Sequence, residues 1–191
     1  MDSYDEDGRP YLAVHPALLD ALTARDDRCM ASLVMSVLDV QLMDVFRHRT
    51  QHAPRSMADA TLQMAFGAFS AHNNLSLVMG WCSPDGHHDL DVLNRVTEAL
   101  VRSEERHPSL GDDPAASLLD EIRMPVDEPR VAERLLISVR PMDAEELMRA
   151  FDAASPLRNR FQKTALLHSL LLAATVSMPF KANGGIGSIL R

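Results

Sequence analysis

The sequence has few aromatic residues, two cysteines and no long run that alternates apolar and polar residues. Aromatic side chains make up 5% of it, so a core must be built from aliphatic residues and from its 11 methionines. Without alternating Val, Ile and Thr a sheet is not expected, whereas leucine and methionine favour helices. The two cysteines, Cys29 and Cys82, cannot make a disulfide framework or a cysteine-rich zinc site, and they suit a reducing compartment.

Signals for secretion and for membrane insertion are also missing. The first ten residues are acidic and lack the apolar region of a signal peptide. The most apolar run, residues 165–178, contains His168 and is shorter than the roughly 20 residues that span a bilayer. We therefore expect a cytoplasmic protein without membrane contact.

Positive charge is scarce over most of the chain. The net charge is −8 at pH 7, and no acidic residue follows Asp152. An acidic body disfavours binding to nucleic-acid phosphates, and no helix-turn-helix with a basic second helix is evident, so we do not expect direct DNA binding. The positive residues after Asp152 either contact an acidic partner or, more simply, solvate the last helix and the tail: Arg158, Arg160, Lys163, Lys181 and Arg191.

Apolar residues at helical spacing predict an all-α, single-domain bundle of about seven or eight helices. We expect a flexible acidic leader (1–15), a helical domain (16–178) and a glycine-rich tail (179–191). Apart from two helices around Gly80, helices are expected from Pro16 and over residues 29–49, 58–66, 115–124, 131–139 (or a strand there), 143–151 and 157–178.

Three of these helices carry more specific expectations. Leu33 belongs to the inward apolar positions of the 29–49 helix. Asp143 and Glu146 have the spacing of a capping box at a helix start. The last helix is apolar nearly all round, which predicts that it is central in the bundle.

The stretch from residue 66 to residue 103 contains two helices joined by a turn. Val78 and Met79 belong to an inward apolar face of the first helix, which ends at Gly80. Ser83 supplies the N-cap of the second helix and a proline follows in its first turn. The residues that we expect on the inward stripe of the second helix are Leu90, Leu93, Val96, Thr97, Leu100 and Val101.

The order of residues in this stretch resembles the mannitol operon repressor family and the related HEPN-like helical domains. Residues 17–46 and 154–173 resemble the family's first helical pair and its closing helix, so the resemblance covers about residues 16–178. It implies a helical fold, a homodimer and a regulator associated with negative control of sugar-alcohol utilisation. In the central stretch it is carried by Gly67, Phe69, Ser70, His72 (where the family has Arg), Leu75, Gly80, Trp81, His88, Asp89, Leu90, Arg95, Val96 and Ser103.

The family's functional motif is altered. Where HEPN-like relatives have Arg-Asn followed by His, this sequence has Thr97, Glu98 and Arg102. A HEPN-type ribonuclease needs His to move a proton and Arg to hold the phosphate, and Arg cannot replace His because it keeps its proton. We expect Thr97 to bond back to its own helix. We therefore predict no catalytic residue and no cofactor, and treat Arg95, Thr97, Glu98 and Arg102 as motif-equivalent or interface positions.

Three functions fit the sequence. The first is a non-enzymatic negative regulator that contacts a protein partner instead of reading DNA. The alternatives are a divergent HEPN-type ribonuclease that uses the out-of-register pair Arg102 and His107, and an antitoxin-like interaction protein that kept the fold. The alternating charges at Asp91, Arg95, Glu98 and Arg102 form either a ladder across a dimer or pairs within one helix.

The histidines do not predict a metal site. His87 and His88 are adjacent and project about 100° apart on a helix, whereas zinc needs three or four converging ligands. We expect His88 and Asp89 to cap the start of their helix and His168 to bond a backbone carbonyl in the core. Cys82 has no neighbouring base pattern that would make it a nucleophile.

Overall fold

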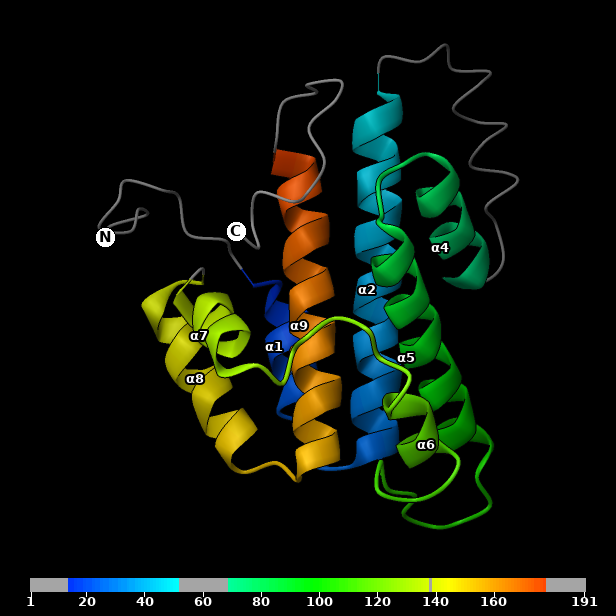
Figure 1. Cartoon of the computed structure of the whole chain (residues 1–191), viewed down its shortest axis with the longest axis vertical. Helices are drawn as coiled ribbons and strands as arrows, with labels where there is room; N and C mark the ends of the chain where they lie inside the picture. Colours follow the sequence, from blue (N-terminus) through cyan, green and yellow to red (C-terminus); the bar gives the residue numbers. More distant parts are fainter. Residues whose placement is uncertain (1–13, 52–68, 138, 178–191) are drawn as a thin grey trace.

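The computed structural model describes residues 14–51, 69–137 and 139–177, which form eight helices and no strand (Figure 1). The all-α fold predicted from the sequence is thus confirmed. The expected 58–66 helix, the tail and nearly all of the leader lie outside these residues, whereas Val14 is already buried. The helices are α1 (Pro16–Leu22), α2 (Asp27–Thr50), α4 (Phe69–Val78), α5 (Pro84–Arg102), α6 (Ala115–Leu119), α7 (Pro129–Ile137), α8 (Pro141–Asp152) and α9 (Pro156–Ser177).

The two longest helices, α2 and α9, form the centre of the bundle and run in the same direction (Figure 1). α5 packs against α2 and runs the opposite way, with α4 and α6 beside it, while α7 and α8 lie on the side of α9. In α9 Phe161 and Leu166 are fully buried and Leu170 is nearly so, which confirms the predicted central place of this helix.

α2 is the most membrane-like helix in the described ranges, by length and composition alone. The sequence alone points instead to residues 165–178 as the most apolar run. Half of the apolar window of α2 is buried inside the bundle, and the core helix of a soluble protein passes the same test. Here α2 packs against α1, α4, α5 and α9, so its inner side serves the core.

Local capping groups define the ends of these helices, and Gly80 and Ser83 act where the sequence predicts them. The Asp26 carboxylate accepts the backbone N–H of Cys29 at the start of α2, and the Ser83 hydroxyl accepts that of Gly86 at the start of α5. Between α4 and α5 Gly80 has a φ of 70°, the left-handed conformation that glycine adopts without a steric penalty. These turns fix the positions of both helices that carry the family resemblance.

Two predicted helix boundaries are wrong. α8 begins at Pro141 without a side-chain cap, and the predicted capping residue Asp143 instead accepts two hydrogen bonds from the Arg140 guanidinium. α6 ends at Leu119 and not at residue 124. The segment after it is held by Asp89 of α5. Residues 129–137 are helical, as preferred from the sequence.

Several predicted inward positions face solvent. Val78 is 80% exposed, and Met79, Val101 and Leu33 are also exposed. α4 buries a polar face instead, which consists of His72, Asn73 and Ser76. Hydrogen bonds link that face to its neighbours: His72 Nδ1 lies 2.5 Å from Asp39 Oδ1 on α2, and the Asn73 amide donates to the carbonyl of His87 on α5.

Candidate functional site

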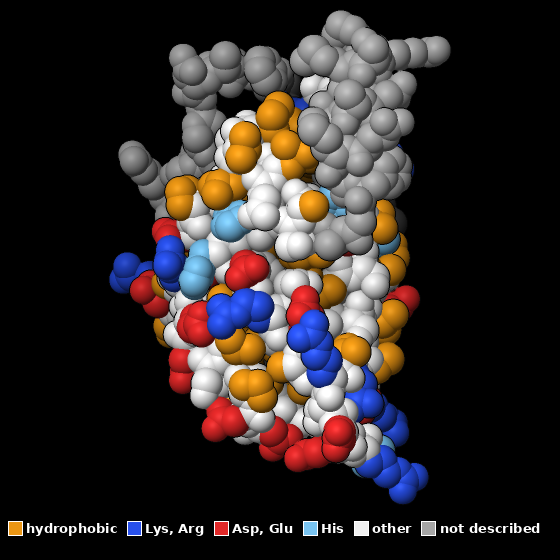
Figure 2. All heavy atoms as spheres, turned by 90° about the vertical axis from the view of Figure 1, so that its right-hand side faces the viewer, with side chains coloured by type: hydrophobic (Ala, Val, Ile, Leu, Met, Phe, Trp, Pro, Cys, Tyr) orange, Lys and Arg blue, Asp and Glu red, His pale blue; other side chains and the backbone are white. Residues whose placement is uncertain are grey.

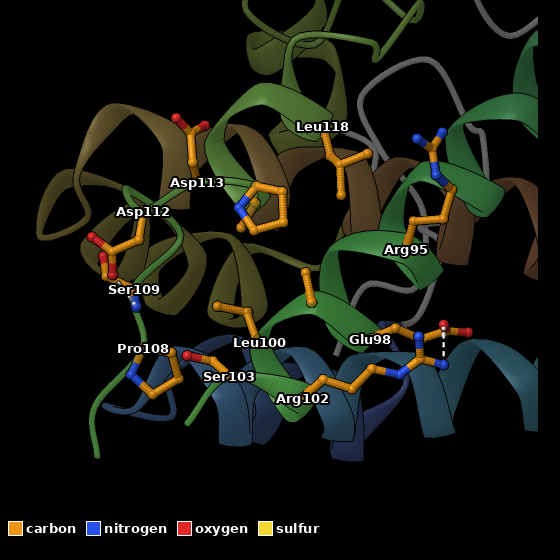
Figure 3. A pocket seen from close by; sticks show the side chains of 13 residues that line it. Arg95, Glu98, Leu100, Arg102, Ser103, Pro108, Ser109, Asp112, Asp113 and Leu118 are labelled. Atoms are coloured by element: carbon orange, nitrogen blue, oxygen red, sulfur yellow. Dashed lines mark hydrogen bonds and ion pairs between the residues drawn. The ribbon is translucent and has the colours of Figure 1, made fainter. Parts of the chain in front are cut away.

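Three of the four motif-equivalent residues line one hollow on the surface, which we call the α5–α6 groove (Figure 3). Arg95, Glu98 and Arg102 project from α5 along one wall, and the connection from α5 to α6 with α6 itself forms the other. The groove has a volume of about 540 Å³. The other residues named in Figure 3 are Leu100, Ser103, Pro108, Ser109, Asp112, Asp113 and Leu118.

The fourth position, Thr97, does not line the groove. It is buried, and its hydroxyl donates to the carbonyl of Leu93 one turn earlier on α5 at 2.9 Å. This is the bond that the sequence predicts for a threonine at the edge of a core. Thr97 therefore has a structural role, and the structure separates it from Arg95, Glu98 and Arg102.

Arg95 and Glu121 make a two-pronged ion pair on the rim of the groove. Arg95 Nη1 lies 2.8 Å from Glu121 Oε2, and Nη2 lies 3.3 Å from Oε1. The hydrogen bond to Glu121 raises the pKa of Arg95, and the same bond lowers the pKa of Glu121. The sequence did not reveal this pair because Glu121 lies 26 positions further on, in the segment after α6.

Arg102 pairs with Glu98 on its own helix. The guanidinium Nη2 lies 3.0 Å from Glu98 Oε2, and the Asn94 amide donates to the other oxygen of the same carboxylate. Of the two arrangements considered for the alternating charges, the pair within one helix is present for Glu98 and Arg102, whereas Arg95 bonds across to Glu121. Both arginines of the groove wall thus have carboxylate partners in the same chain.

The opposite wall of the groove is acidic and its floor is apolar. Asp112 accepts the backbone N–H of Ser109, and Asp113 accepts the hydroxyl of Ser117, so both carboxylates are held in place. Leu100 and Leu118 lie between the two charged walls (Figure 3). Such a hollow suits a polypeptide segment with apolar and charged side chains.

The runner-up catalytic pair, Arg102 and His107, is divided between two hollows. Arg102 lines the α5–α6 groove, whereas His107 lines a second hollow of about 480 Å³ near the starts of α2 and α9. His107 is exposed, and its Nδ1 lies 4.0 Å from Asp26 Oδ2. Pro108 and Ser109 line both hollows.

Arg28 of α2 fixes the end of α5 below the groove. Its guanidinium donates to the carbonyls of Leu100, Ser103 and Glu105 at 3.0, 2.9 and 2.9 Å. The last carbonyls of a helix have no partner within the helix. A positive charge at this end also interacts favourably with the negative end of the helix dipole. The sequence did not predict this contact because it joins residues more than 70 positions apart.

Asp89 of α5 and His168 of α9 form a buried pair, and neither has its predicted role. Asp89 is fully buried and accepts the backbone N–H groups of Arg123 and Met124 at 2.8 and 3.0 Å, while Ser83 caps α5. His168 Nε2 faces Asp89 at 3.8 Å instead of bonding a carbonyl. Burial acts to raise the pKa of Asp89, but His168 and the two N–H donors outweigh it, so the pKa is lowered.

His88 and Cys82 offer no reactive centre. His88 Nε2 lies 3.0 Å from the carbonyl oxygen of Glu121, so it holds the segment after α6 and does not cap α5. Burial raises the pKa of the Cys82 thiol to about 11, which is opposite to the activation that a nucleophile requires. In the described part of the chain no three His, Cys, Asp or Glu side chains converge as metal ligands.

The arginines at the start of α9 are bound within the chain. Arg158 donates to the carbonyls of Ala24 and Arg25 and pairs with Asp27, and Arg160 reaches Asp120 and Asp127. On the face that Figure 2 shows, positive and negative side chains are interspersed and no continuous basic patch forms. Of the five late positive residues, Lys181 and Arg191 lie outside the described ranges.

Comparisons with known proteins give one similarity of fold. No protein-family model matches the sequence, and no curated protein matches it. Among solved structures, a chain of the X-ray structure of the MtlR–HPr complex from Escherichia coli matches with a TM-score of 0.52 and 14% sequence identity. The match covers 84% of this chain and 96% of that chain. The chain therefore shares a distant MtlR-like fold.

Proposed function

We propose that the chain is a non-enzymatic regulatory protein that acts as a negative regulator through contacts with another protein. The observation that carries this proposal is the fold similarity to a chain of the MtlR–HPr complex, since that protein was solved bound to a protein partner. The resemblance of the sequence to the mannitol operon repressor family supports the same conclusion independently. We propose negative control because of that family resemblance. We propose the cytoplasm as the location because of the composition of the sequence.

The α5–α6 groove is the surface that we propose for the partner. It combines an apolar floor with one acidic wall and one wall on which Arg95, Glu98 and Arg102 alternate in charge, and such a surface fixes the orientation of a bound polypeptide. The side chains of both walls are held by hydrogen bonds in the free protein, so little order is lost when a partner binds. HPr is the first partner to test because it is the one named for the structural relative.

Direct reading of DNA is not part of the proposal. The chain has a net charge of −8, and Arg158 and Arg160 already have carboxylate partners. Catalysis is not part of it either: the in-register positions are a threonine bonded to its own helix and a glutamate and an arginine that pair with each other, and none of them is the histidine that such a ribonuclease uses.

The test is a calorimetric titration of the full chain with HPr. Two variants probe the groove: Ala99→Arg, which fills it, and Arg102→Glu, which reverses one charge on its wall. Filling the groove should weaken binding by more than about tenfold, and the charge reversal should weaken it less and mainly at low salt. Arg106→Glu is the matched control, because Arg106 is exposed and lines neither hollow.

The outcomes separate the partner from the surface. No binding of HPr to the wild type would exclude HPr as the partner. Binding that Ala99→Arg leaves unchanged would exclude the groove. The two alternatives are tested apart: a ribonuclease would cleave single-stranded RNA, and an antitoxin-like protein would bind and neutralise a toxic protein encoded beside it.

A homodimer is part of the proposal because HEPN-like relatives pair at this flank of α5. Arg95 and Arg102 would then make ion pairs with the second copy in addition to their partners in the same chain. Reversing both charges (Arg95→Glu with Arg102→Glu) should weaken such a dimer, most clearly at low salt. An unchanged dimer would mean that the second copy binds another face.

A further inference from the structure

The outer side of α2 carries a regular row of positions that are exposed or, at Met43, half-buried, which we call the outer seam. Leu33 is 45% exposed and Val40 is 51% exposed, although both lie in the middle of the bundle's central helix. Steps of four and three residues alternate along the row, the spacing of a coiled-coil contact line. The seam consists of Cys29, Leu33, Ser36, Val40, Met43 and Arg47.

The seam lies opposite the side of α2 that packs in the bundle. At 100° per residue, Leu33, Ser36 and Val40 point about 100–160° away from the buried Val34 and Leu38. The neighbouring helices α1, α4, α5 and α9 occupy that buried side. α2 is therefore apolar on two faces, and the outer one has no helix against it among the described elements.

Charge is almost absent from this part of α2. Across residues 29–43 the one charged residue is Asp39, whose carboxylate is already bonded to His72. A helix face that only contacts water typically carries many more charges. The combination of heptad spacing, exposed branched side chains and missing charge is that of a helix-pairing surface.

We propose that the outer seam binds a second copy of this chain, with the two α2 helices packed antiparallel about a two-fold axis near residue 38. In this register every seam residue meets another seam residue. Ser36 faces the partner's Val40, Leu33 faces the partner's Met43, and Cys29 faces the partner's Arg47. Each small side chain, at position 29 or 36, faces a larger one on the second helix, at position 47 or 40. This alternation lets the two helices approach closely.

The charges at the ends of the seam select the antiparallel orientation. Arg47 and Asp44 are both more than half exposed. A parallel pair would set Arg47 against the partner's Arg47 and Asp44 against the partner's Asp44. The antiparallel pair brings Arg47 to the first turn of the partner helix, where the half-exposed Asp26 lies, and it also opposes the two helix dipoles.

This pairing goes beyond the proposed regulatory function and does not rest on it, and it places the second copy on α2 instead of on the flank of α5 that the family resemblance suggests. The seam is on α2, whereas the groove proposed for a partner protein lies between α5 and α6, so both surfaces can be occupied together. A seam of six residues makes a small interface, and we expect a dimer that dissociates on dilution.

Sedimentation velocity over a concentration series tests the self-association. The wild type should shift from monomer toward dimer with concentration, and Leu33→Lys with Val40→Lys should weaken association by more than about tenfold because ammonium groups would be buried. Both positions are exposed, so circular dichroism should show an intact fold. Val101→Lys, at an equally exposed position on α5, is the matched control and should behave as the wild type.

Disulfide crosslinking tests the orientation. With Arg47→Cys the new thiol faces the native Cys29 of the partner, so mild oxidation should give a covalent dimer. With Cys29→Ser in the same variant the two introduced thiols lie about 27 Å apart along the seam, 18 residues at 1.5 Å each, and no dimer should form. Cys82 should not interfere because its thiol pKa of about 11 keeps it protonated.

The results that would overturn the proposal are specific. A wild type that stays monomeric at high concentration would exclude the seam as a dimer interface, and so would a double lysine variant that associates normally. Crosslinking of the wild type through its native Cys29 would show a parallel pair. Loss of the dimer only in Arg95→Glu with Arg102→Glu would place the second copy on α5.

Discussion

Replacing Asp89 by asparagine should lower the free energy of unfolding, and the size of the loss follows from the hydrogen bonds that the carboxylate accepts. The carboxylate accepts N–H groups of Arg123 and Met124 at 2.8 and 3.0 Å in a fully buried position. Asparagine keeps the shape but has one acceptor oxygen, so one of these N–H groups would meet an amide donor. A hydrogen bond to a buried charged group contributes about 1.5–3 kcal/mol, and we expect Asp89→Asn to lower the free energy of unfolding by about 2–3 kcal/mol.

The pH dependence of this loss follows from the lowered pKa of Asp89. Because the pKa is lower in the folded chain than its ordinary value of 3.8, the carboxylate stabilises the fold above that value. The stabilisation is lost as the pH falls through the folded pKa. Asparagine does not titrate, so the difference between wild type and variant should be constant near neutral pH and should shrink in acid below 3.8.

Urea unfolding followed by circular dichroism measures the effect as a lower midpoint with an unchanged slope. Asp91→Asn is the matched control, since Asp91 lies on the same helix and is half exposed; its effect should stay within about 0.5 kcal/mol. Two results would refute the view that the Asp89 carboxylate holds the segment after α6 in place. One is that Asp89→Asn lowers the free energy of unfolding by no more than the control does. The other is that its difference from the wild type stays the same in acid.

The remaining predictions concern packing, capping and activity. Leu170→Ala in α9 should cost about 2–5 kcal/mol of stability in the same assay, and less than about 1 kcal/mol would mean a peripheral helix. Arg28→Ala should cost about 1.5–3 kcal/mol because three carbonyls at the end of α5 lose their donor; Arg106→Ala should cost almost nothing. Purified protein should not cleave single-stranded RNA, and cleavage that His107→Ala abolishes would make the ribonuclease the first choice. Duplex DNA should not bind at sub-micromolar affinity in a mobility-shift assay at physiological salt.

Helix positions could be predicted because their signals are local. Asp26, Gly80 and Ser83 act on groups within a few residues, so their types alone place the ends of α2, α4 and α5. The central place of α9 followed from its apolar surface. The capping box of Asp143 failed because a neighbouring Arg140 competes for the same carboxylate.

The inner face of α4 could not be predicted from hydrophobic spacing because it is polar. His72, Asn73 and Ser76 are buried and make hydrogen bonds to α2, to α5 and within α4 itself, and such polar groups leave no apolar period in the sequence. Val78 and Met79 are apolar and have helical spacing, so the sequence predicts that they face inward, although both are exposed. Burial of a polar side chain depends on where its partner lies, which the periodicity of one helix does not encode.

The candidate site was predicted in part. The bond of Thr97 back to its own helix could be predicted because Thr97 lies two helical turns after the inward-facing Leu90. The Glu98–Arg102 pair could be predicted from its i,i+4 spacing. The groove itself was not foreseen, because its second wall comes from the connection after α5. Nor were the contacts of Arg95 with Glu121 or of Arg28 with the end of α5, since each joins distant segments.

The parallel arrangement of α2 and α9 has a consequence for how the chain folds. Contacts between the two ends of the bundle's core span most of the sequence: Gln162 and Leu22 are 140 positions apart, and Arg49 and Thr175 are 126 apart. Closing such long loops is slow compared with the local contacts of an ordinary up-and-down bundle. During synthesis the surfaces of α2 and α5 that pack against α9 stay uncovered until α9 leaves the ribosome. The nascent protein therefore passes through a long aggregation-prone stage in which chaperones would act.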